Sequence, residues 1–359
     1  MITQEHLETV PQPGAVPQAL EIREAAAGDE ARWNAFVHAH AHGTFFHLFG
    51  WKTVLERAFR HPTHFLLAES DGVVRGVLPL GHVRSLLFGN ALVSTPFAVY
   101  GGVLAADDTA RERLIREATA LAAKLKVDHL EIRERRPVHP DWLGKDLYVT
   151  FRKTIEPDPE ANLQAIPRKQ RRMVRKGIGS GLVSELDPEI DRFYAMYSES
   201  VRNLGTPVFS RRYFRVLQEV FGDDCEVLVV THRGVAVAGV MNFYFRDEVL
   251  PYYGGGTDAA RALAANDFMY WEVMRRACER GLRTFDFGRS KREVGSYRFK
   301  KHWGFDPEPL HYAYNLVRAT AVPDVNPLNP KYRIFVETWK KLPLPLSRLL
   351  GPLLSRSLG

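Results

Sequence analysis

Residues 226–245 read EVLVVTHRGVAVAGVMNFYF. Two apolar runs in this stretch flank a short turn that carries Gly234, which is the pattern of two strands joined by a tight turn. A third apolar run follows and ends in a glycine step at Tyr253. We therefore expect three successive strands, arranged as a meander, in the second half of the chain.

The first half of the chain repeats this pattern. Matching pairs occur at one constant interval: Gly43 with Gly205, Val54 with Val216, and Gly72 with Gly234. The interval shortens slightly where Tyr100-Gly101-Gly102 matches Tyr253-Gly254-Gly255. A constant interval interrupted by a small deletion is what duplication of a single unit produces.

Each copy has the same order of expected elements: a helix, a three-stranded meander, an amphipathic helix and a last strand. In the first copy these are a helix over 51–59, strands over 65–68 and 73–80, a strand ending at Tyr100, a helix with the stripe Leu114, Ala118, Leu121 and Leu125, and a strand over 130–132. In the second copy they are 213–221, 226–230, 235–245, a strand ending at Tyr253, a helix with the stripe Trp271, Met274 and Cys278, and 285–287. This order predicts an α/β (α+β) chain of two tandem GNAT-like (acyl-CoA N-acyltransferase) domains, with mixed central sheets flanked by helices.

Four segments follow from this division. We expect a disordered N-terminus over 1–19, a first GNAT-like domain over 20–150, a second over 151–318 and a basic, Leu/Pro-rich tail over 319–359. The leucines of the tail are interleaved with Lys340, Lys341, Arg348 and Arg356. Such a tail can lie on an anionic membrane leaflet, or its leucines can pack back onto the second domain.

Composition narrows the class of protein. The 359 residues are 45% hydrophobic and 25% charged, which excludes a disordered chain, and the net charge of +7 favours anionic partners. Two cysteines, Cys225 and Cys278, cannot form a disulfide framework and are expected to be core thiols. The N-terminal residues do not have the pattern of a signal peptide, and glycines and prolines interrupt the longest uncharged stretch, 85–106. We expect a cytoplasmic, monomeric protein, with peripheral contact at the inner membrane through the tail.

Three segments resemble a known family: FFHLFGWK at 45–52, KQRRMVRKG at 169–177 and GRSKREVGSYRFKKHWG at 288–304. The last contains the pattern Phe-Lys-x-x-aromatic-Gly near the end of the second copy. Over about residues 20–318 the chain resembles the FemAB/FemX-like superfamily of tandem-GNAT acyl- and aminoacyltransferases. Within it, the chain looks similar to the FemAB-related proteins associated with PEP-CTERM/exosortase and exopolysaccharide systems.

The resemblance implies an N-acyltransferase in which an acceptor amine attacks an activated acyl or aminoacyl donor. It implies aminoacyl-tRNA or acyl-CoA as donor co-substrate, an amine on an anionic small molecule or glycan precursor as acceptor, and no tightly bound cofactor. The chain departs from the family in lacking a long helical hairpin. The loops 105–110 and 257–266, where an acyl-CoA enzyme has a glycine-rich phosphate loop, contain no glycine.

Three residues are candidates for catalysis. The resemblance implies that Lys300 stabilises the negative charge that develops on the donor carbonyl. Asp286 closes its strand and is a candidate base for the acceptor ammonium, or a turn residue. Tyr253 precedes the glycine step, which either lets a ligand approach the backbone or marks a bulge. Ser296 is expected to cap the helix that displays Lys300 and ends at Gly304.

Eight residues are candidates for substrate binding. Arg171 and Arg175 lie on the basic face expected for 167–176, which either binds phosphate or is a solvated face. The resemblance places Trp51 and Lys52 at an acceptor groove; the alternative is an exposed lysine beside a core tryptophan. The remaining candidates follow the last strand of the second copy, where the alternative is solvated cations and packing aromatics: Arg289, Tyr297, Arg298 and Phe299.

Other chemistries receive less support. His38, His40, His42 and His47 lack the carboxylates or thiolates of a metal site, so we expect none. One rival function is an acyl-CoA-dependent N-acetyltransferase of an amino sugar. A second is a non-catalytic, membrane-associated assembly factor that retains the fold. A third, non-specific RNA binding, lacks stacking aromatics among most of the basic residues.

Overall fold

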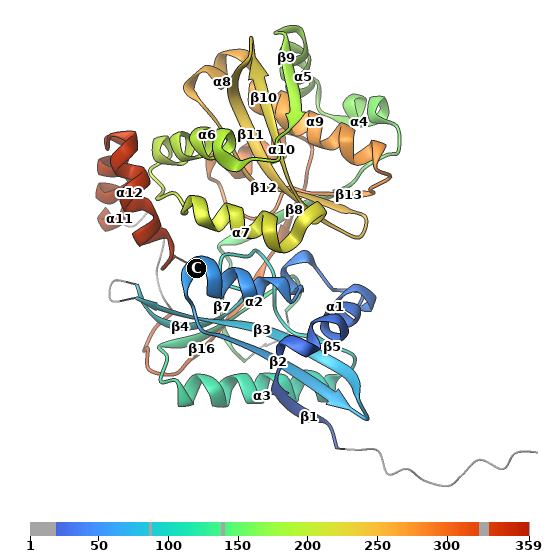
Figure 1. Ribbon diagram of the computed structural model, residues 1–359, viewed down its shortest axis with the longest axis vertical. Helices are drawn as coiled ribbons and strands as arrows, with labels where there is room; N and C mark the ends of the chain where they lie inside the picture. The colour runs from blue at the N-terminus through green and yellow to red at the C-terminus, as the bar shows by residue number, and fades with distance from the viewer. Residues whose placement is uncertain (1–18, 86–87, 138–140, 323–329, 359) are drawn as a thin grey trace, which may run out of the picture.

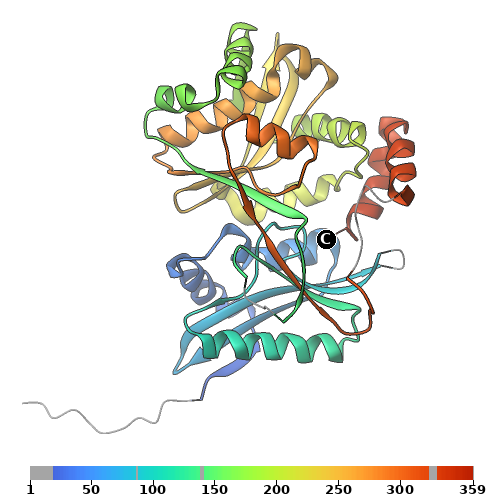
Figure 2. The same ribbon diagram turned by 180° about the vertical axis from the view of Figure 1, so that it is seen from behind.

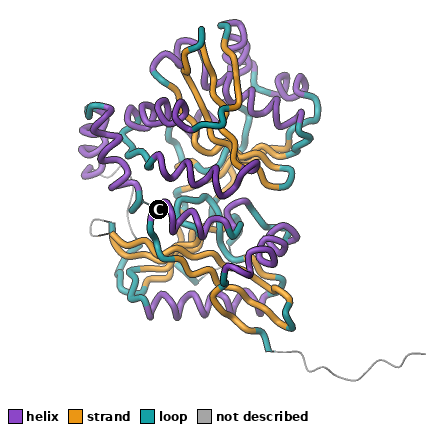
Figure 3. Tube along the Cα trace, viewed as in Figure 1, coloured by secondary structure: helices purple, strands orange, loops and turns teal. Residues whose placement is uncertain are grey.

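A computed structural model describes residues 19–85, 88–137, 141–322 and 330–358, and the side chains of 330–332 are left aside. All of the expected N-terminal disorder except Ala19 lies outside these residues. The described chain forms two stacked halves, each built on a twisted sheet with helices on its faces (Figures 1 and 3).

The first sheet has the order β1-β2-β3-β4-β6-β16-β7, with β5 paired to β3. Its parallel pair, β4 with β6, lies among antiparallel neighbours. Helix α3 covers one face of the sheet, and α1, α2 and the π-helical turn η3 lie on the other side (Figure 1). The strands are β1 Glu21–Glu24, β2 Thr63–Ser70, β3 Val73–Ser85, β4 Gly89–Ser94, β5 Leu104–Ala105, β6 His129–Glu134, β7 Leu143–Lys145 and β16 His311–Leu316; the helices are α1 Glu30–Ala39, α2 Gly50–Val54, η3 Leu55–Phe59 and α3 Asp108–Lys124.

The second sheet has the order β14-β8-β13-β12-β11-β10-β9, with β15 paired to β8. Alternate residues of β10 and β11 enter two different cores: Val229 packs with α6 and α7, whereas Leu228 packs with α5 and α9. The strands are β8 Tyr148–Thr154, β9 Leu182–Leu186, β10 Cys225–His232, β11 Val235–Phe245, β12 Glu248–Gly256, β13 Thr284–Asp286, β14 Ser290–Lys291 and β15 Pro307–Pro309. The helices are α4 Pro159–Ala165, α5 Arg168–Gly179, α6 Ile190–Asn203, α7 Arg211–Phe221, α8 Asp258–Leu263, α9 Ala265–Glu279 and α10 Gly295–His302.

The two sheets confirm the predicted mixed α/β fold with tandem GNAT-like order. Each half contains a helix, three antiparallel strands, a long helix and a strand that pairs in parallel with the third. The predicted ends of the third strands were wrong: in the first copy this strand ends at Ser94 and not at Tyr100, and in the second it continues past Tyr253 to Gly256. Thr95 and Phe97 adopt positive φ values, and these two residues turn the chain away from the sheet.

The two halves exchange strands. β8 follows the first half in sequence but lies in the second sheet, paired with β13. β16 follows the second half but returns to the first sheet, between β6 and β7. The two crossing strands are visible in Figure 2, and the expected boundary at residue 150 falls inside β8.

An aromatic core joins the two halves. The rings of Phe45 and Phe243 stack with centroids 4.4 Å apart, and those of Phe59 and Tyr213 lie 4.7 Å apart. Gly50 at the start of α2 touches α7, where an added Cβ would lie 2.7 Å from Val220. The halves therefore fold against each other as one unit.

The tail forms two helices, α11 Pro330–Lys340 and α12 Leu344–Ser355, which lie beside α6 (Figure 1). No described helix combines the length and the apolar character that crossing a bilayer requires. Packing of the tail leucines onto the second domain, one of the two alternatives for this segment, does not hold for Leu346, Leu349 and Leu353, which are exposed.

The strand exchange makes a prediction about truncation. A chain that stops at Leu310 loses β16 and leaves β6 and β7 without their shared neighbour, so we expect loss of the cooperative thermal transition and aggregation. A chain that stops at Ala319 keeps β16 and is the matched control. Circular dichroism and size-exclusion chromatography compare the two. Native-like melting of the shorter chain would show that β16 is dispensable.

Candidate active site

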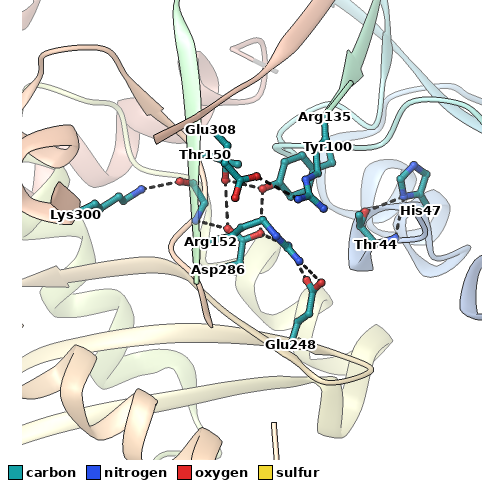
Figure 4. Close-up of polar contacts among 11 residues, drawn as sticks. Thr44, His47, Tyr100, Arg135, Thr150, Arg152, Glu248, Asp286, Lys300 and Glu308 are labelled. Carbon is teal, nitrogen blue, oxygen red and sulfur yellow. Dashed lines mark hydrogen bonds and ion pairs between the residues drawn. The ribbon is translucent and has the colours of Figure 1, made fainter. Parts of the chain in front are cut away.

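Asp286 ends β13 at the junction of the two halves, and its carboxylate is fully buried. Oδ2 accepts hydrogen bonds from the Tyr100 hydroxyl at 3.0 Å and from Arg152 at 2.8 Å (Figure 4). Oδ1 accepts bonds from the backbone N–H of Gly288 at 2.7 Å and from the Thr150 hydroxyl at 3.3 Å. Both oxygens are therefore engaged, which favours a role in fixing the junction over one as a base.

Each partner of Asp286 is itself held. Arg152 on β8 also binds both oxygens of Glu248, which neutralises its charge within the sheet. Burial and the nearby Asp286 carboxylate raise the pKa of Tyr100, so its phenol stays neutral and donates. Tyr100 belongs to the first half, Thr150 and Arg152 to the crossing strand, and Asp286 to the second half. The cluster thus ties three segments that are distant in the sequence.

Lys300 on α10 is buried and donates hydrogen bonds from Nζ to the carbonyl oxygens of Gly288, at 2.9 Å, and Arg289, at 3.0 Å. Burial lowers the pKa of this amine to about 7. Lys300 therefore lies beside the Asp286 segment, as the sequence suggested. The expected cap was wrong: α10 begins at Gly295 after Val294, and no side-chain cap bond is made at this end.

Two candidate residues lie in the aromatic core instead of at this junction. The Tyr253 hydroxyl bonds the Tyr213 hydroxyl at 2.7 Å, and burial raises the pKa of Tyr253. Trp51 is 0% exposed and donates its Nε1–H to the Phe45 carbonyl. Substrate cannot touch either side chain in this conformation. Lys52 is partly exposed on α2 and bonds Glu56 and Thr63.

The other candidates from the second half are divided among different surroundings. The Arg289 guanidinium lies 4.6 Å from the Tyr148 ring and bonds the Tyr312 hydroxyl, and it lines a pocket of about 260 Å³. Tyr297 packs on Phe151, Phe299 packs between Tyr270 and Trp303, and Arg298 is exposed.

Helix α5 carries the basic segment at the far end of the second half (Figure 1). Val174 and Gln170 are buried toward α9, and the cations point outward. Arg171 bonds the carbonyl and side-chain oxygens of Gln164, whereas Arg175 is exposed. Its exposed neighbours are Arg168, Lys169, Arg172 and Lys176. Arg171 and Arg175 are therefore not brought together with Asp286 and Lys300.

A larger pocket, of about 510 Å³, lies in the first half. β4 and β6 pair only as far as Val93 and Glu131, and the chains then separate. The pocket opens between these two diverging chains, and Tyr100 forms part of its wall. Its charged and histidine lining consists of four arginines, two carboxyl groups and two histidines: Arg111, Arg133, Arg135, Arg136, Asp108, Glu134, His42 and His47.

Glu134 is the half-buried carboxyl group of this pocket, whereas Asp108 is exposed. Its Oε1 accepts a 2.8 Å hydrogen bond from the Val103 N–H, and burial raises its pKa to about 7. Arg135 lies 5.6 Å from the Tyr100 ring and bonds Glu308 at 3.3 Å, so the pocket adjoins the Asp286 cluster (Figure 4). This site was not predicted from the sequence, although Arg-Glu-Arg-Arg at 133–136, directly after the strand over 130–132, was a usable signal.

The histidines of this region have separate partners. His47 is bonded through Nδ1 to Thr44 at 2.8 Å, and burial lowers its pKa to about 3. His40 bonds the Ala105 carbonyl at 3.1 Å. Among the residues that the structure describes, no three His, Cys, Asp or Glu side chains are grouped to hold a metal ion. Cys225 and Cys278 are buried free thiols.

Residues 162–301 match the family of acetyltransferase (GNAT) domains. The second half contains a GNAT acetyltransferase domain. No curated protein matches the chain by sequence.

Solved structures share the tandem fold. FemX is 15% identical, with a TM-score of 0.63 over 88% of this chain and 100% of that one. A tandem GNAT protein from the clavulanic acid biosynthesis pathway is 15% identical, with a TM-score of 0.54 over 85% and 100%. L-PGS from Bacillus licheniformis is 13% identical, with a TM-score of 0.52 over 90% and 97%. At these identities the likeness shows the fold alone.

GNAT domains usually take acyl-CoA, whose phosphates bind at the N-terminus of the central helix. In this GNAT domain that helix is α9, and its first turn carries Asp267, which accepts bonds from Gln170 and Trp303. Helix α5 packs directly on the turn: a Cβ on Gly177 would lie 3.2 Å from the Ala264 carbonyl oxygen. A carboxylate and a packed helix at this terminus do not fit a diphosphate.

The geometry of Asp286 makes a prediction about stability. Asp286→Ala leaves Arg152 paired with Glu248 but removes the acceptor of the buried Tyr100 and Thr150 hydroxyls and the Gly288 N–H. Each unsatisfied buried group costs about 1–3 kcal/mol, so we expect a clear fall in Tm. Asp286→Asn keeps the size but removes the charge and should destabilise as well. Thermal melts measure both. A variant that melts like the wild type but loses all transfer activity would instead assign Asp286 to the chemistry.

Proposed function

We propose that the chain is an N-acyltransferase of FemAB type, which transfers an acyl or aminoacyl group to an amine on a cell-envelope or exopolysaccharide precursor. The observation that carries this proposal is the pocket of the first half, where Arg111, Arg135 and Arg136 surround Glu134. A guanidinium group can donate two parallel hydrogen bonds to the oxygens of one phosphate. This pocket therefore suits a phosphate-bearing precursor. The GNAT domain supports acyl transfer as the reaction class.

Glu134 is the proposed base of this reaction. The acceptor ammonium gives one proton to the Glu134 carboxylate, and the freed amine attacks the carbonyl carbon of the donor. A C–N bond forms, and the C–O bond of an ester or the C–S bond of a thioester breaks. The second proton of the attacking nitrogen passes to the departing oxygen or sulfur, which leaves as the alcohol or thiol. A carboxyl group with a pKa of about 7 is well matched to this task near neutral pH.

Lys300 keeps the role that the resemblance implies, as the cation that stabilises the carbonyl oxyanion. Its Nζ donates hydrogen bonds to the carbonyls of Gly288 and Arg289, which follow Asp286 in the chain. The cluster around Asp286 adjoins the wall of the pocket. Arg289, Tyr297, Arg298, Phe299 and Lys52 remain proposed contacts of substrate.

The proposed donor is an aminoacyl-tRNA or another activated acyl group. The exposed cations of α5 suit the phosphates of a nucleic acid, and the N-terminus of α9 does not suit acyl-CoA. An acyl-CoA-dependent N-acetyltransferase of an amino sugar is the second candidate, favoured by the GNAT match. Cytoplasmic location, a monomeric state and association with PEP-CTERM/exosortase and exopolysaccharide systems belong to the same proposal and rest on composition and resemblance.

Ligand binding tests the pocket. In differential scanning fluorimetry with UDP-sugars, charged tRNA, CoA and acetyl-CoA, a ligand at about 100 times its Kd adds about 2.7 kcal/mol. We expect a UDP-sugar to raise Tm and the shift to be lost in Arg135→Ala/Arg136→Ala. Arg212→Ala, which removes an exposed arginine of α7, is the matched control.

Other outcomes of this experiment would favour the alternative functions. A CoA shift that survives the double substitution would favour the acyl-CoA enzyme of the second half. If no ligand shifts the Tm and the Arg135→Ala/Arg136→Ala variant keeps full biological activity, the non-catalytic assembly factor is favoured.

The pKa of Glu134 sets the pH dependence. The carboxylate must be deprotonated to accept a proton, whereas Lys300, whose pKa also lies at about 7, must keep its proton to act as a cation. We therefore expect the transfer rate to rise with pH toward about 7 and to fall above it. A general base contributes roughly 100-fold or more, so Glu134→Gln should lower the rate by about that factor and abolish this rise. Glu134→Asp should retain part of both. A rate profile of Glu134→Gln that keeps the wild-type rise would exclude Glu134 as the base.

A further inference from the structure

Helix α12 packs on the second half through its small residues. Ser347, Gly351 and Ser355 are buried, and a Cβ on Gly351 would lie 2.9 Å from the backbone nitrogen of Val208. Ser355 donates to the Val208 carbonyl at 3.1 Å, and Arg348 donates to the Ser198 hydroxyl at 2.8 Å. These contacts fix which side of α12 faces the protein.

The apolar side of the tail consequently faces outward. Ile334 is 72% exposed, Leu349 is 69% exposed and Leu353 is 64% exposed. A surface helix ordinarily turns its apolar side toward the core, so this orientation leaves an apolar face without a partner. Further exposed apolar side chains of the tail are Phe335, Leu346 and Leu358.

Cations accompany this face. Arg333, Lys341 and Arg356 are exposed, and Lys340 pairs with Glu337. Apolar side chains flanked by cations suit the boundary between the headgroups and acyl chains of an anionic membrane. A second copy of the chain fits this face less well, because a two-fold contact would bring like charges together.

We propose that the outward face of α11 and α12, the tail face, docks the protein on an anionic lipid surface. The leucines enter the boundary between headgroups and acyl chains, and the cations bind lipid phosphates. The side of α12 that carries the small residues remains packed on the second half. Docking does not require the proposed transferase activity, because the tail face shares no residue with the pocket of Glu134.

Vesicle sedimentation of the full chain tests the tail face. We expect binding to vesicles of phosphatidylglycerol and phosphatidylcholine in equal parts, weaker binding to phosphatidylcholine alone, and release by high salt. Leu349→Gln/Leu353→Gln should lower the partition coefficient by at least about tenfold, because two side chains no longer transfer apolar surface from water into the headgroup boundary.

The matched control is Val183→Gln/Val235→Gln, which changes two exposed valines of the second half and should leave binding unchanged. Both leucines are exposed, so thermal melts should show an intact fold. Wild-type binding by the leucine variant, no binding by the wild type, or equal binding to neutral vesicles would overturn the proposal. So would a wild-type dimer, seen by light scattering, that the leucine substitutions dissociate.

Discussion

A carboxylate without access to water requires an opposite charge and several hydrogen bonds, and Asp286 imposes this requirement on the centre of the molecule. Its partners come from separate segments: Tyr100 from the loop after β4, and Thr150 and Arg152 from β8. These segments cannot shift independently without leaving a buried charge unpaired. The position of Tyr100 in turn shapes the pocket that Glu134 and the arginines line.

The exchange of β8 and β16 also ties the two halves together. Each sheet is completed by a strand from the other side of the chain, and the aromatic core of Phe45, Phe243 and their neighbours fills the space between them. A duplicated unit has thereby become one folding unit with two unequal copies. The first copy holds the large pocket, whereas in the second copy α5 and Asp267 cover the equivalent helix terminus.

Three charged surfaces have different proposed ligands. The pocket of the first half has guanidinium groups and a carboxyl for a phosphate-bearing amine, α5 presents cations at the far end of the second half, and the tail face combines leucines with cations. The pocket beside Arg289 is lined by Ser357 and Leu358, so the end of the tail reaches the junction of the halves.

The sequence by itself determined the order of elements and the fold class. Apolar periodicity, turn glycines and the internal repeat are local signals, and the strand over Val235–Phe245 matches its prediction at both ends. Asp286 and Lys300 are only 14 residues apart, so both could be assigned to the segment that follows the last strand of the second copy. The remaining features could not be predicted from local patterns. Strand exchange, the burial of Trp51 and Tyr253, and the outward leucines of α12 depend on which surfaces meet, and residue spacing along the chain does not carry that information.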